Sequence, residues 1–112
     1  MSSVTLTGVS GSKYVYEAFP YATTSWNDIP GNYAFAYQAQ NNMWPILYVG
    51  QCDSFQKRIP NHERWAEAAK AGATHVLAHS NTNGELARQA EEQDVIGHHQ
   101  PPLNTQHMRR AG

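Results

Sequence analysis

The sequence predicts a small α/β domain, in which an antiparallel three-stranded sheet is flanked by helices and extended by an amino-terminal β-hairpin. Alternating aromatic and small residues over 32–38 and a continuous apolar run over 45–49 each predict a strand. After Gly50 the spacing of apolar residues changes from two toward 3.6, which indicates helices. With 112 residues, the chain is expected to form a single domain, 1–112.

The first two core strands are expected to pair as a hairpin. Residues 32–38 should form a half-buried strand whose aromatic face comprises Tyr33, Phe35 and Tyr37. Residues 45–49 are apolar throughout, as expected of a more central strand. The polar residues 40–42 supply turn chemistry between the two strands.

The amino-terminal segment predicts a hairpin of its own. Residues 4–7 and 13–19 read as strands joined by a turn rich in glycine and serine. We therefore expect residues 1–30 to form this hairpin and a loop that leads into a core over 31–104. Residues 105–112 are expected to be a flexible tail.

Two short helices and a third strand are expected next. Asp53 or Ser54 can cap the first helix, and Pro60 forces the chain to begin a new one. The second helix should end at Gly72, and the strand should follow over 74–80. The apolar stripe of the second helix is expected to comprise Trp65, Ala66 and Ala69.

The last helix, expected over residues 85–96 and closed by Gly97, carries two neighbouring glutamates. At 100° per residue, its apolar side comprises Leu86, Ala87, Ala90 and Ile96. Glu92 falls at one edge of this side and is expected to be half-buried, whereas Glu91 falls at the opposite edge and is expected to face solvent. The alternative for Glu92 is a surface ion pair with Arg88.

The charge balance bears directly on partners. Eight Lys and Arg residues against nine Asp and Glu residues give a net charge of −1, whereas a nucleic-acid-binding protein normally carries a basic surplus or stripe. The adjacent basic pairs are Lys57-Arg58 and Arg109-Arg110. Binding to random duplex DNA is therefore expected to be weak.

The sequence gives no indication of a membrane span, a disulfide or a zinc site. It contains no run of 18 apolar residues, and its start resembles no secretory signal, so we expect a cytoplasmic location. The single cysteine, Cys52, allows no intramolecular disulfide. His98, His99 and His107 lack the spacing of known zinc motifs.

Several residues with chemically useful side chains follow one another along the chain in a specific order. The two predicted strands contain the triplets Gly31-Asn32-Tyr33 and Tyr48-Val49-Gly50, and these are followed by Arg58, His62, Glu92 and Pro101-Pro102-Leu103-Asn104. Tyrosines on paired strands are, taken alone, more typical of packing. The ordered set, which spans residues 31–104, resembles the GIY-YIG nuclease domain.

The resemblance implies a metal-dependent endonuclease that hydrolyses DNA phosphodiester bonds. Tyr33 and Tyr48 would lie at the attacking water and the phosphate, and the sequence leaves open which of them is the base. Arg58 would hold the phosphate with its forked, permanently charged guanidinium. His62 would accept a proton, although a helix cap or a surface position is the alternative. Glu92 would bind one Mg²⁺ or Mn²⁺ ion.

The resemblance also implies residues that contact substrate, namely Gly50, Gln51, Lys57 and Asn104. Gln51 stands where some relatives have lysine, and Asn32 replaces the middle isoleucine of the first motif. The expected partner is DNA, with a partner protein or a dimer supplying affinity. The alternative function is a catalytically weak accessory module of the same type that binds nucleic acid or a protein.

Overall fold

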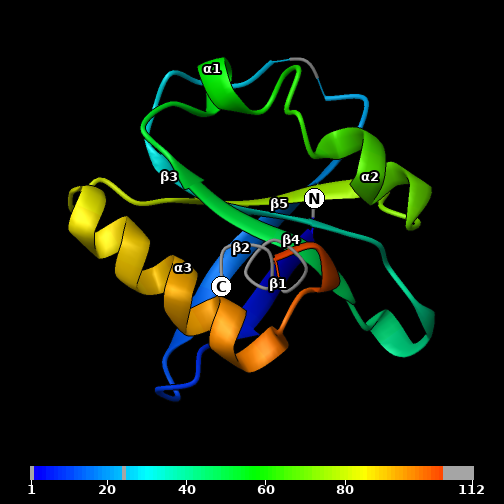
Figure 1. Ribbon diagram of the computed structural model, residues 1–112, viewed down its shortest axis with the longest axis horizontal. Helices are drawn as coiled ribbons and strands as arrows, with labels where there is room; N and C mark the ends of the chain where they lie inside the picture. Colours follow the sequence, from blue (N-terminus) through cyan, green and yellow to red (C-terminus); the bar gives the residue numbers. More distant parts are fainter. Residues whose placement is uncertain (1, 24, 105–112) are drawn as a thin grey trace.

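Five antiparallel strands form one sheet in the part of the chain that the computed structural model describes, residues 2–23 and 25–104. Their order across the sheet is β1-β2-β5-β3-β4 (Figure 1). The strands are β1 (Ser2–Thr7), β2 (Lys13–Pro20), β3 (Gly31–Ala36), β4 (Ile46–Cys52) and β5 (His75–Ser80). The expected amino-terminal hairpin is confirmed, and β2 joins it to the remaining strands by pairing with β5.

Helices cover both faces of the sheet. The helix α3 (Glu85–His99) lies on one face, while α1 (Phe55–Arg58) and α2 (Trp65–Lys70) lie on the other (Figure 1). A single 3₁₀ turn, η1 (Gln40–Asn42), connects β3 and β4. The alternation of side chains along the strands therefore produces two separate apolar cores, one beneath α3 and one beneath α1 and α2.

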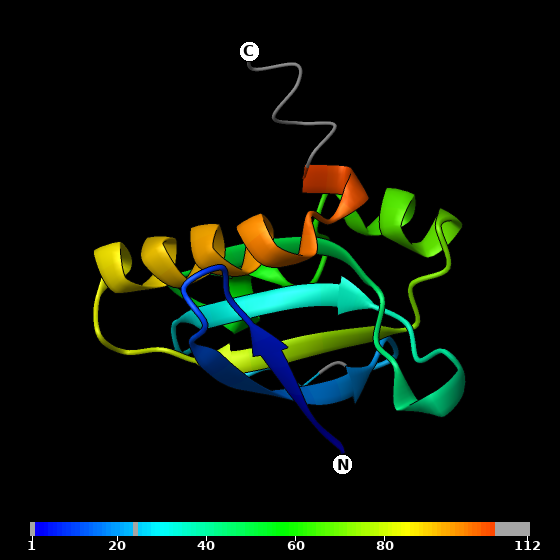
Figure 2. The same ribbon diagram turned by 90° about the horizontal axis from the view of Figure 1, so that it is seen from below.

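The turn of the amino-terminal hairpin is fastened to α3. Figure 2 shows α3 running along the sheet with this turn beside it. The Asp94 carboxylate accepts hydrogen bonds from the Ser10 backbone and hydroxyl and from the Tyr14 hydroxyl, at 2.6 to 2.9 Å. These contacts join the hairpin to the layer that carries the last helix.

Two expectations about the central strands are wrong. All six residues of β3 are buried, so it is not half-buried, because β5 and β4 flank it and helices cover both its faces. Conversely, β4 lies at an edge of the sheet and is not its more central strand. Its residues are apolar because one face of β4 packs under α3 and the other face belongs to the core beneath α1 and α2.

The short helices follow the sequence in part. Ser54 caps α1, because its hydroxyl accepts the Lys57 backbone N–H at 3.2 Å. The expected stripe on α2 is right for Trp65, which packs against the core, and wrong for Ala66 and Ala69, which are exposed while Ala68 is buried. Only the face of α2 that packs against β3 is buried. The sequence pattern assigned the other two alanines to that face.

The buried side of α3 is nearly opposite to the expected one. Leu86 is 82% exposed, and Ala90 is exposed as well, whereas the buried residues are Arg88, Glu91, Val95 and Ile96. The expectation that Glu91 faces solvent is therefore wrong, while Glu92 is half-buried as expected. The helix also continues to His99 instead of closing at Gly97.

Other expectations concern single features. Cys52 is a buried free thiol in β4. None of the helices in residues 2–23 and 25–104 is long and apolar enough to cross a membrane. The expected flexible tail, 105–112, lies outside the described residues.

Candidate functional site

The two motif tyrosines lie on adjacent strands. Tyr33 on β3 is paired with Gly50 on β4, and a Cβ atom added to Gly50 would lie 2.5 Å from the Tyr33 oxygen Oη. Glycine is therefore required here, because any side chain would displace the phenol. The Tyr48 ring lies 6.4 Å from the Tyr33 ring, centroid to centroid. Tyr33 is buried, and Tyr48 is half-buried.

His62 joins this pair from the segment between α1 and α2. Its Nε2 lies 2.7 Å from the Tyr33 Oη, and its ring lies 5.4 Å from that of Tyr48. His62 is only 5% exposed, so the alternative of a surface histidine is wrong. The sequence positions 33, 48 and 62 therefore meet in one aromatic cluster.

The hydrogen bonds of His62 define its tautomer. Its Nδ1 accepts the backbone N–H of Arg64 at 3.0 Å, so the proton of the neutral ring is on Nε2. Nε2 therefore donates to Tyr33 Oη. The expected role of His62 in accepting a proton during the reaction stays a prediction. The resting direction of this bond is set by the Arg64 backbone contact, which depends on the local fold.

Burial keeps all three of these groups neutral near pH 7. Burial and, second to it, the nearby Arg58 charge lower the pKa of His62 to about 4. Burial also raises the pKa of both Tyr33 and Tyr48, while the Arg58 guanidinium opposes that rise. The cluster therefore consists of two phenols and a neutral imidazole.

Arg58 lies at the end of α1 and is engaged by one carboxylate. Its two terminal nitrogens donate to the two oxygens of Glu63 at 2.6 and 2.7 Å, a bidentate pair. This pairing raises the pKa of Arg58 and lowers that of Glu63 to about 2. Arg58 therefore carries its charge beside the tyrosines, but a phosphate must compete with Glu63 for it.

Glu92 reaches the same region from α3. Burial raises the pKa of its carboxyl group, and its charge in turn raises the pKa of both Tyr33 and Tyr48. Within the described residues, no group of three His, Cys, Asp or Glu side chains could hold a metal ion. Mg²⁺ needs only one or two carboxylates, because it keeps several waters and binds substrate phosphates. The single Glu92 carboxylate fits Mg²⁺ or Mn²⁺ in that mode.

A second arginine, Arg88, which the sequence suggested only as a surface partner for Glu92, lies next to Gln51. The Arg88 Nε donates to the side-chain oxygen of Gln51 at 3.1 Å, although Arg88 is only 7% exposed. Arg58, Gln51 and Arg88 line the same groove of about 320 Å³. Arg88 thus places a second arginine in this groove, beside Gln51. Arg88 lies seven residues before the apolar Val95, a spacing that places both on one face of a helix. This spacing is the feature of the sequence that could have indicated that Arg88 is buried.

The remaining predicted substrate contacts differ in accessibility. Lys57 is exposed on α1, one residue before Arg58. Asn104 is buried, and its amide pairs with the backbone N–H and C=O of Val49 at 2.7 and 2.9 Å. Asn104 therefore holds the carboxy-terminal segment against β4, which is a structural role.

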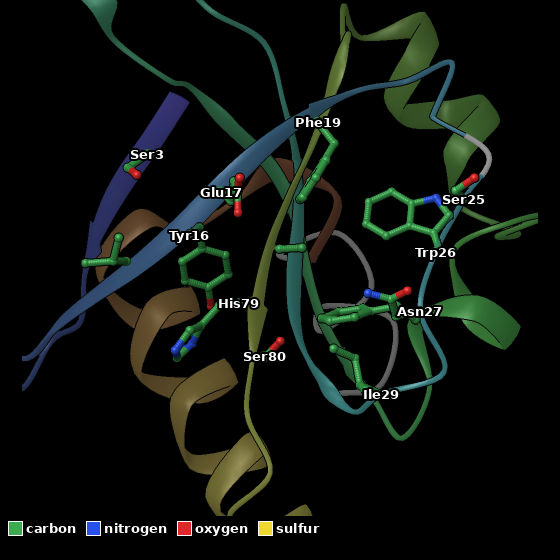
Figure 3. A pocket seen from close by; sticks show the side chains of 13 residues that line it. Ser3, Tyr16, Glu17, Phe19, Ser25, Trp26, Asn27, Ile29, His79 and Ser80 are labelled. Atoms are coloured by element: carbon green, nitrogen blue, oxygen red, sulfur yellow. The ribbon is translucent and has the colours of Figure 1, made fainter. Parts of the chain in front are cut away.

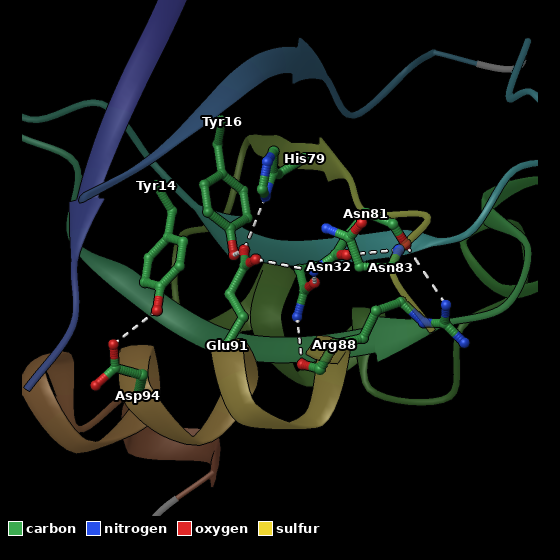
Figure 4. A network of polar contacts seen from close by, with 9 residues as sticks. All are labelled: Tyr14, Tyr16, Asn32, His79, Asn81, Asn83, Arg88, Glu91 and Asp94. Atoms are coloured by element: carbon green, nitrogen blue, oxygen red, sulfur yellow. Dashed lines mark hydrogen bonds and ion pairs between the residues drawn. The ribbon is translucent and has the colours of Figure 1, made fainter. Parts of the chain in front are cut away.

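Glu91 is the centre of a buried polar network (Figure 4). Its carboxylate accepts from the Tyr16 hydroxyl at 2.7 Å and from Asn81 at 3.1 Å, and it lies 2.9 Å from His79 Nδ1. Asn32 extends the network, because it donates to the Arg88 backbone carbonyl at 2.9 Å and accepts from Asn81. Asn32 is fully buried, so it brings a polar partner for α3 into the core.

A separate groove of about 370 Å³ opens between β2, β5 and the loop at 25–29 (Figure 3). Phe19 and Trp26 meet edge to face at one end of it, 5.2 Å apart. None of the predicted site residues lines it. The chemistry suggested by the sequence is therefore associated with β3, β4, α1 and α3.

No protein-family model matches this chain, and neither a curated protein nor a solved structure matches it.

Proposed function

We propose that this protein is a metal-dependent endonuclease that hydrolyses DNA phosphodiester bonds with a site of the GIY-YIG type. The observation that carries the proposal is the 2.7 Å contact between Tyr33 and His62, with the Tyr48 ring beside both. These three residues are separated in sequence and come from different elements. A buried phenol and a buried imidazole each need a hydrogen-bond partner, and here each provides one for the other.

Each side chain has a distinct role in this proposal. Tyr33 would be the base that activates water: burial raises the pKa of its phenol, and the His62 N–H and the Arg58 charge oppose that rise. The half-buried Tyr48 would donate its hydroxyl to a phosphate oxygen. Arg58 would exchange Glu63 for the phosphate and stabilise the added negative charge of the transition state.

Glu92 would hold the divalent ion. Mg²⁺ or Mn²⁺ bound there would supply positive charge at the phosphate and a more acidic water. The half-buried carboxylate suits this role, because burial without a bound cation raises its pKa and a cation reverses that penalty.

The arrangement of strands is compatible with the proposed family. Strands β5, β3 and β4 are consecutive in the sheet and carry both motif triplets, so they would form the three-stranded core of a GIY-YIG domain. The hairpin of β1 and β2 would then be an addition at the β5 side. Because the net charge is only −1, a partner protein or a dimer would supply much of the affinity for DNA.

A plasmid-nicking assay tests the proposal. The purified protein is expected to convert supercoiled DNA to nicked or linear forms with Mg²⁺ or Mn²⁺ and not with EDTA. The Tyr33→Phe variant, which keeps the ring and removes the hydroxyl, serves to exclude a contaminating nuclease and should lose this activity. Cleavage that survives in Tyr33→Phe would contradict the proposed site.

A specific observation also favours a second candidate function, an accessory module with little or no catalysis. Tyr33 is 1% exposed, and Arg58 is occupied by Glu63, so the site as it stands presents little reactive surface. Such a module would bind nucleic acid or a protein without cutting. Failure of the wild-type protein to nick DNA with either metal, combined with retained binding, would select this candidate.

A further inference from the structure

A groove lined by aromatic side chains shares His62 with the cluster that contains Tyr33. It has a volume of about 560 Å³, and we call it the aromatic groove. Its aromatic and imidazole lining comprises Tyr21, Trp26, Phe35, His62 and Trp65. His62 thus contributes one side to the groove and its Nε2 to Tyr33.

The lining of this groove includes a stacked pair of rings. Tyr21 and Trp65 lie 4.1 Å apart with their planes 15° from parallel, and Tyr21 is 57% exposed. Trp65 in turn meets Phe35 edge to face at 4.9 Å, which fixes the pair to β3. An exposed, rigid aromatic surface of this kind offers a platform on which another flat ring can stack.

The lining of the aromatic groove carries no formal charge when His62 is neutral. A groove for phosphate would contain cations, as the groove with Arg58 and Arg88 does, although Asp53 and Glu85 line that groove as well. Here the polar side chains are Thr23 and Asn61, a hydroxyl and an amide that can pair with the edge of a base. This chemistry suits a nucleobase and does not suit a sugar–phosphate backbone.

We infer that the aromatic groove binds an unpaired nucleobase of the substrate strand, so that the protein acts on single-stranded or locally unpaired DNA. This inference rests on the proposed function and names its substrate class. It also accounts for the charge balance, because a net charge of −1 gives little attraction to phosphates and base stacking is then the available source of affinity. In duplex DNA the bases are stacked on one another and cannot enter.

The test compares three DNA probes of equal length, titrated into the full chain while its tryptophan fluorescence is followed. Ca²⁺ replaces Mg²⁺ so that binding is measured without cleavage. The probes are an oligothymidine, an abasic oligonucleotide with the same number of phosphates, and a blunt duplex. We expect the oligothymidine to quench the fluorescence and to bind about fivefold or more tightly than the abasic probe, since each stacked base contributes at least that factor. The duplex should bind weakly and lose affinity steeply as salt rises.

Variants identify the groove as the place where the base binds. Tyr21→Leu removes an exposed ring without opening a core cavity and should bring the oligothymidine affinity down to that of the abasic probe. Tyr21→Phe keeps the ring and should preserve binding. Trp44→Leu is the matched control, because Trp44 is a half-buried tryptophan outside this groove, packed against His75. Circular dichroism confirms the fold of each variant.

Two results would overturn the inference: equal affinity for the oligothymidine and the abasic probe, or unchanged oligothymidine binding by Tyr21→Leu. The second would assign the groove to another occupant, such as an apolar peptide. These outcomes are distinct from failure of the nuclease proposal. Base-dependent binding by a wild-type protein that never nicks DNA supports the inference and removes the enzyme, whereas nicking without base-dependent binding does the opposite.

Discussion

The side-chain amide of Asn104 pairs with both backbone polar groups of Val49, in the same way as a residue of a neighbouring strand would. Because β4 is an edge strand, these groups have no partner strand on that side. One amide, 55 residues away along the chain, therefore closes part of an exposed sheet edge.

This pairing predicts a structural effect at Asn104. Asn104→Leu should lower the free energy of unfolding by about 2 kcal/mol or more, because the N–H and C=O of Val49 lose their partners in a buried place. Urea unfolding measures the change. Gln89→Ala, which removes an exposed helical contact to Glu85, is the control and should change stability by less than about 0.5 kcal/mol. An equally small change in Asn104→Leu would mean that water forms hydrogen bonds with the N–H and C=O of Val49 when the amide is removed.

The glutamates of α3 should respond differently to substitution. Glu92→Gln keeps the shape of the side chain and removes the charge that would hold the metal, so cleavage should fall by orders of magnitude while DNA binding in Ca²⁺ persists. Its stability should hardly change, because burial already disfavours the charged form. The matched control is Glu17→Gln, another half-buried carboxylate, which lies on the groove of Figure 3 and should cleave normally. Normal cleavage by Glu92→Gln would place the metal elsewhere.

Glu91 should instead contribute to stability. Glu91→Ala leaves the Tyr16 hydroxyl and the Asn81 amide without their buried acceptor, so the free energy of unfolding should fall by about 3 kcal/mol or more. Thermal or urea unfolding measures this loss. Cleavage per folded molecule should be retained, since Glu91 contacts none of the proposed catalytic side chains in the described network. A wild-type melting curve for Glu91→Ala would show that the network carries no net stability.

The Arg58–Glu63 pair predicts opposite effects of two substitutions. Arg58→Lys keeps the charge but loses the fork, so cleavage should fall strongly with less than about 1 kcal/mol of change in stability, because the pair is partly exposed. Glu63→Gln frees the guanidinium and should lower the KM for DNA without lowering kcat. Steady-state kinetics on a labelled oligonucleotide separate the two parameters. A lower kcat in Glu63→Gln would indicate that Glu63 holds Arg58 in its active position.

His62 predicts a loss of stability toward acid. Its pKa is lowered from 6.5 to about 4 in the folded chain, so the unfolded chain takes up the proton first as pH falls. The contribution of neutral His62 to the free energy of unfolding is fully present above the unfolded pKa of 6.5. It is lost as the pH falls toward the folded pKa of about 4, and the loss by then amounts to about 3 kcal/mol. Urea unfolding across this window, compared with His62→Gln, measures the contribution. A stability curve of the same slope in both proteins would contradict the low pKa.

Elements with a strong local signal were predicted from the sequence. The alternation in β1 and β2, the run in β5 and the hydroxyl of Ser54 each act within a few residues, so their structures follow from local sterics and hydrogen bonding. The same holds for Gly72, which follows α2 with a φ of +108° that favours glycine. A local pattern sufficed wherever the partner of a residue was its own neighbour in the chain.

The tertiary structure alone decided which face of α3 is buried and what His62 does. Arg88 and Glu91 can be buried because side chains of other elements form hydrogen bonds with them, namely Gln51, Tyr16 and Asn81. A helical wheel drawn from the sequence contains no information about these distant partners, so it predicted that the alanines face the core. Likewise, β3 became the covered strand because β5 crosses over to pair with it. The direction of the Tyr33–His62 bond depends on a backbone N–H at Arg64 whose position only the folded chain defines. Sequence determines the groups available, whereas burial and long-range hydrogen bonds determine their charge states and contacts.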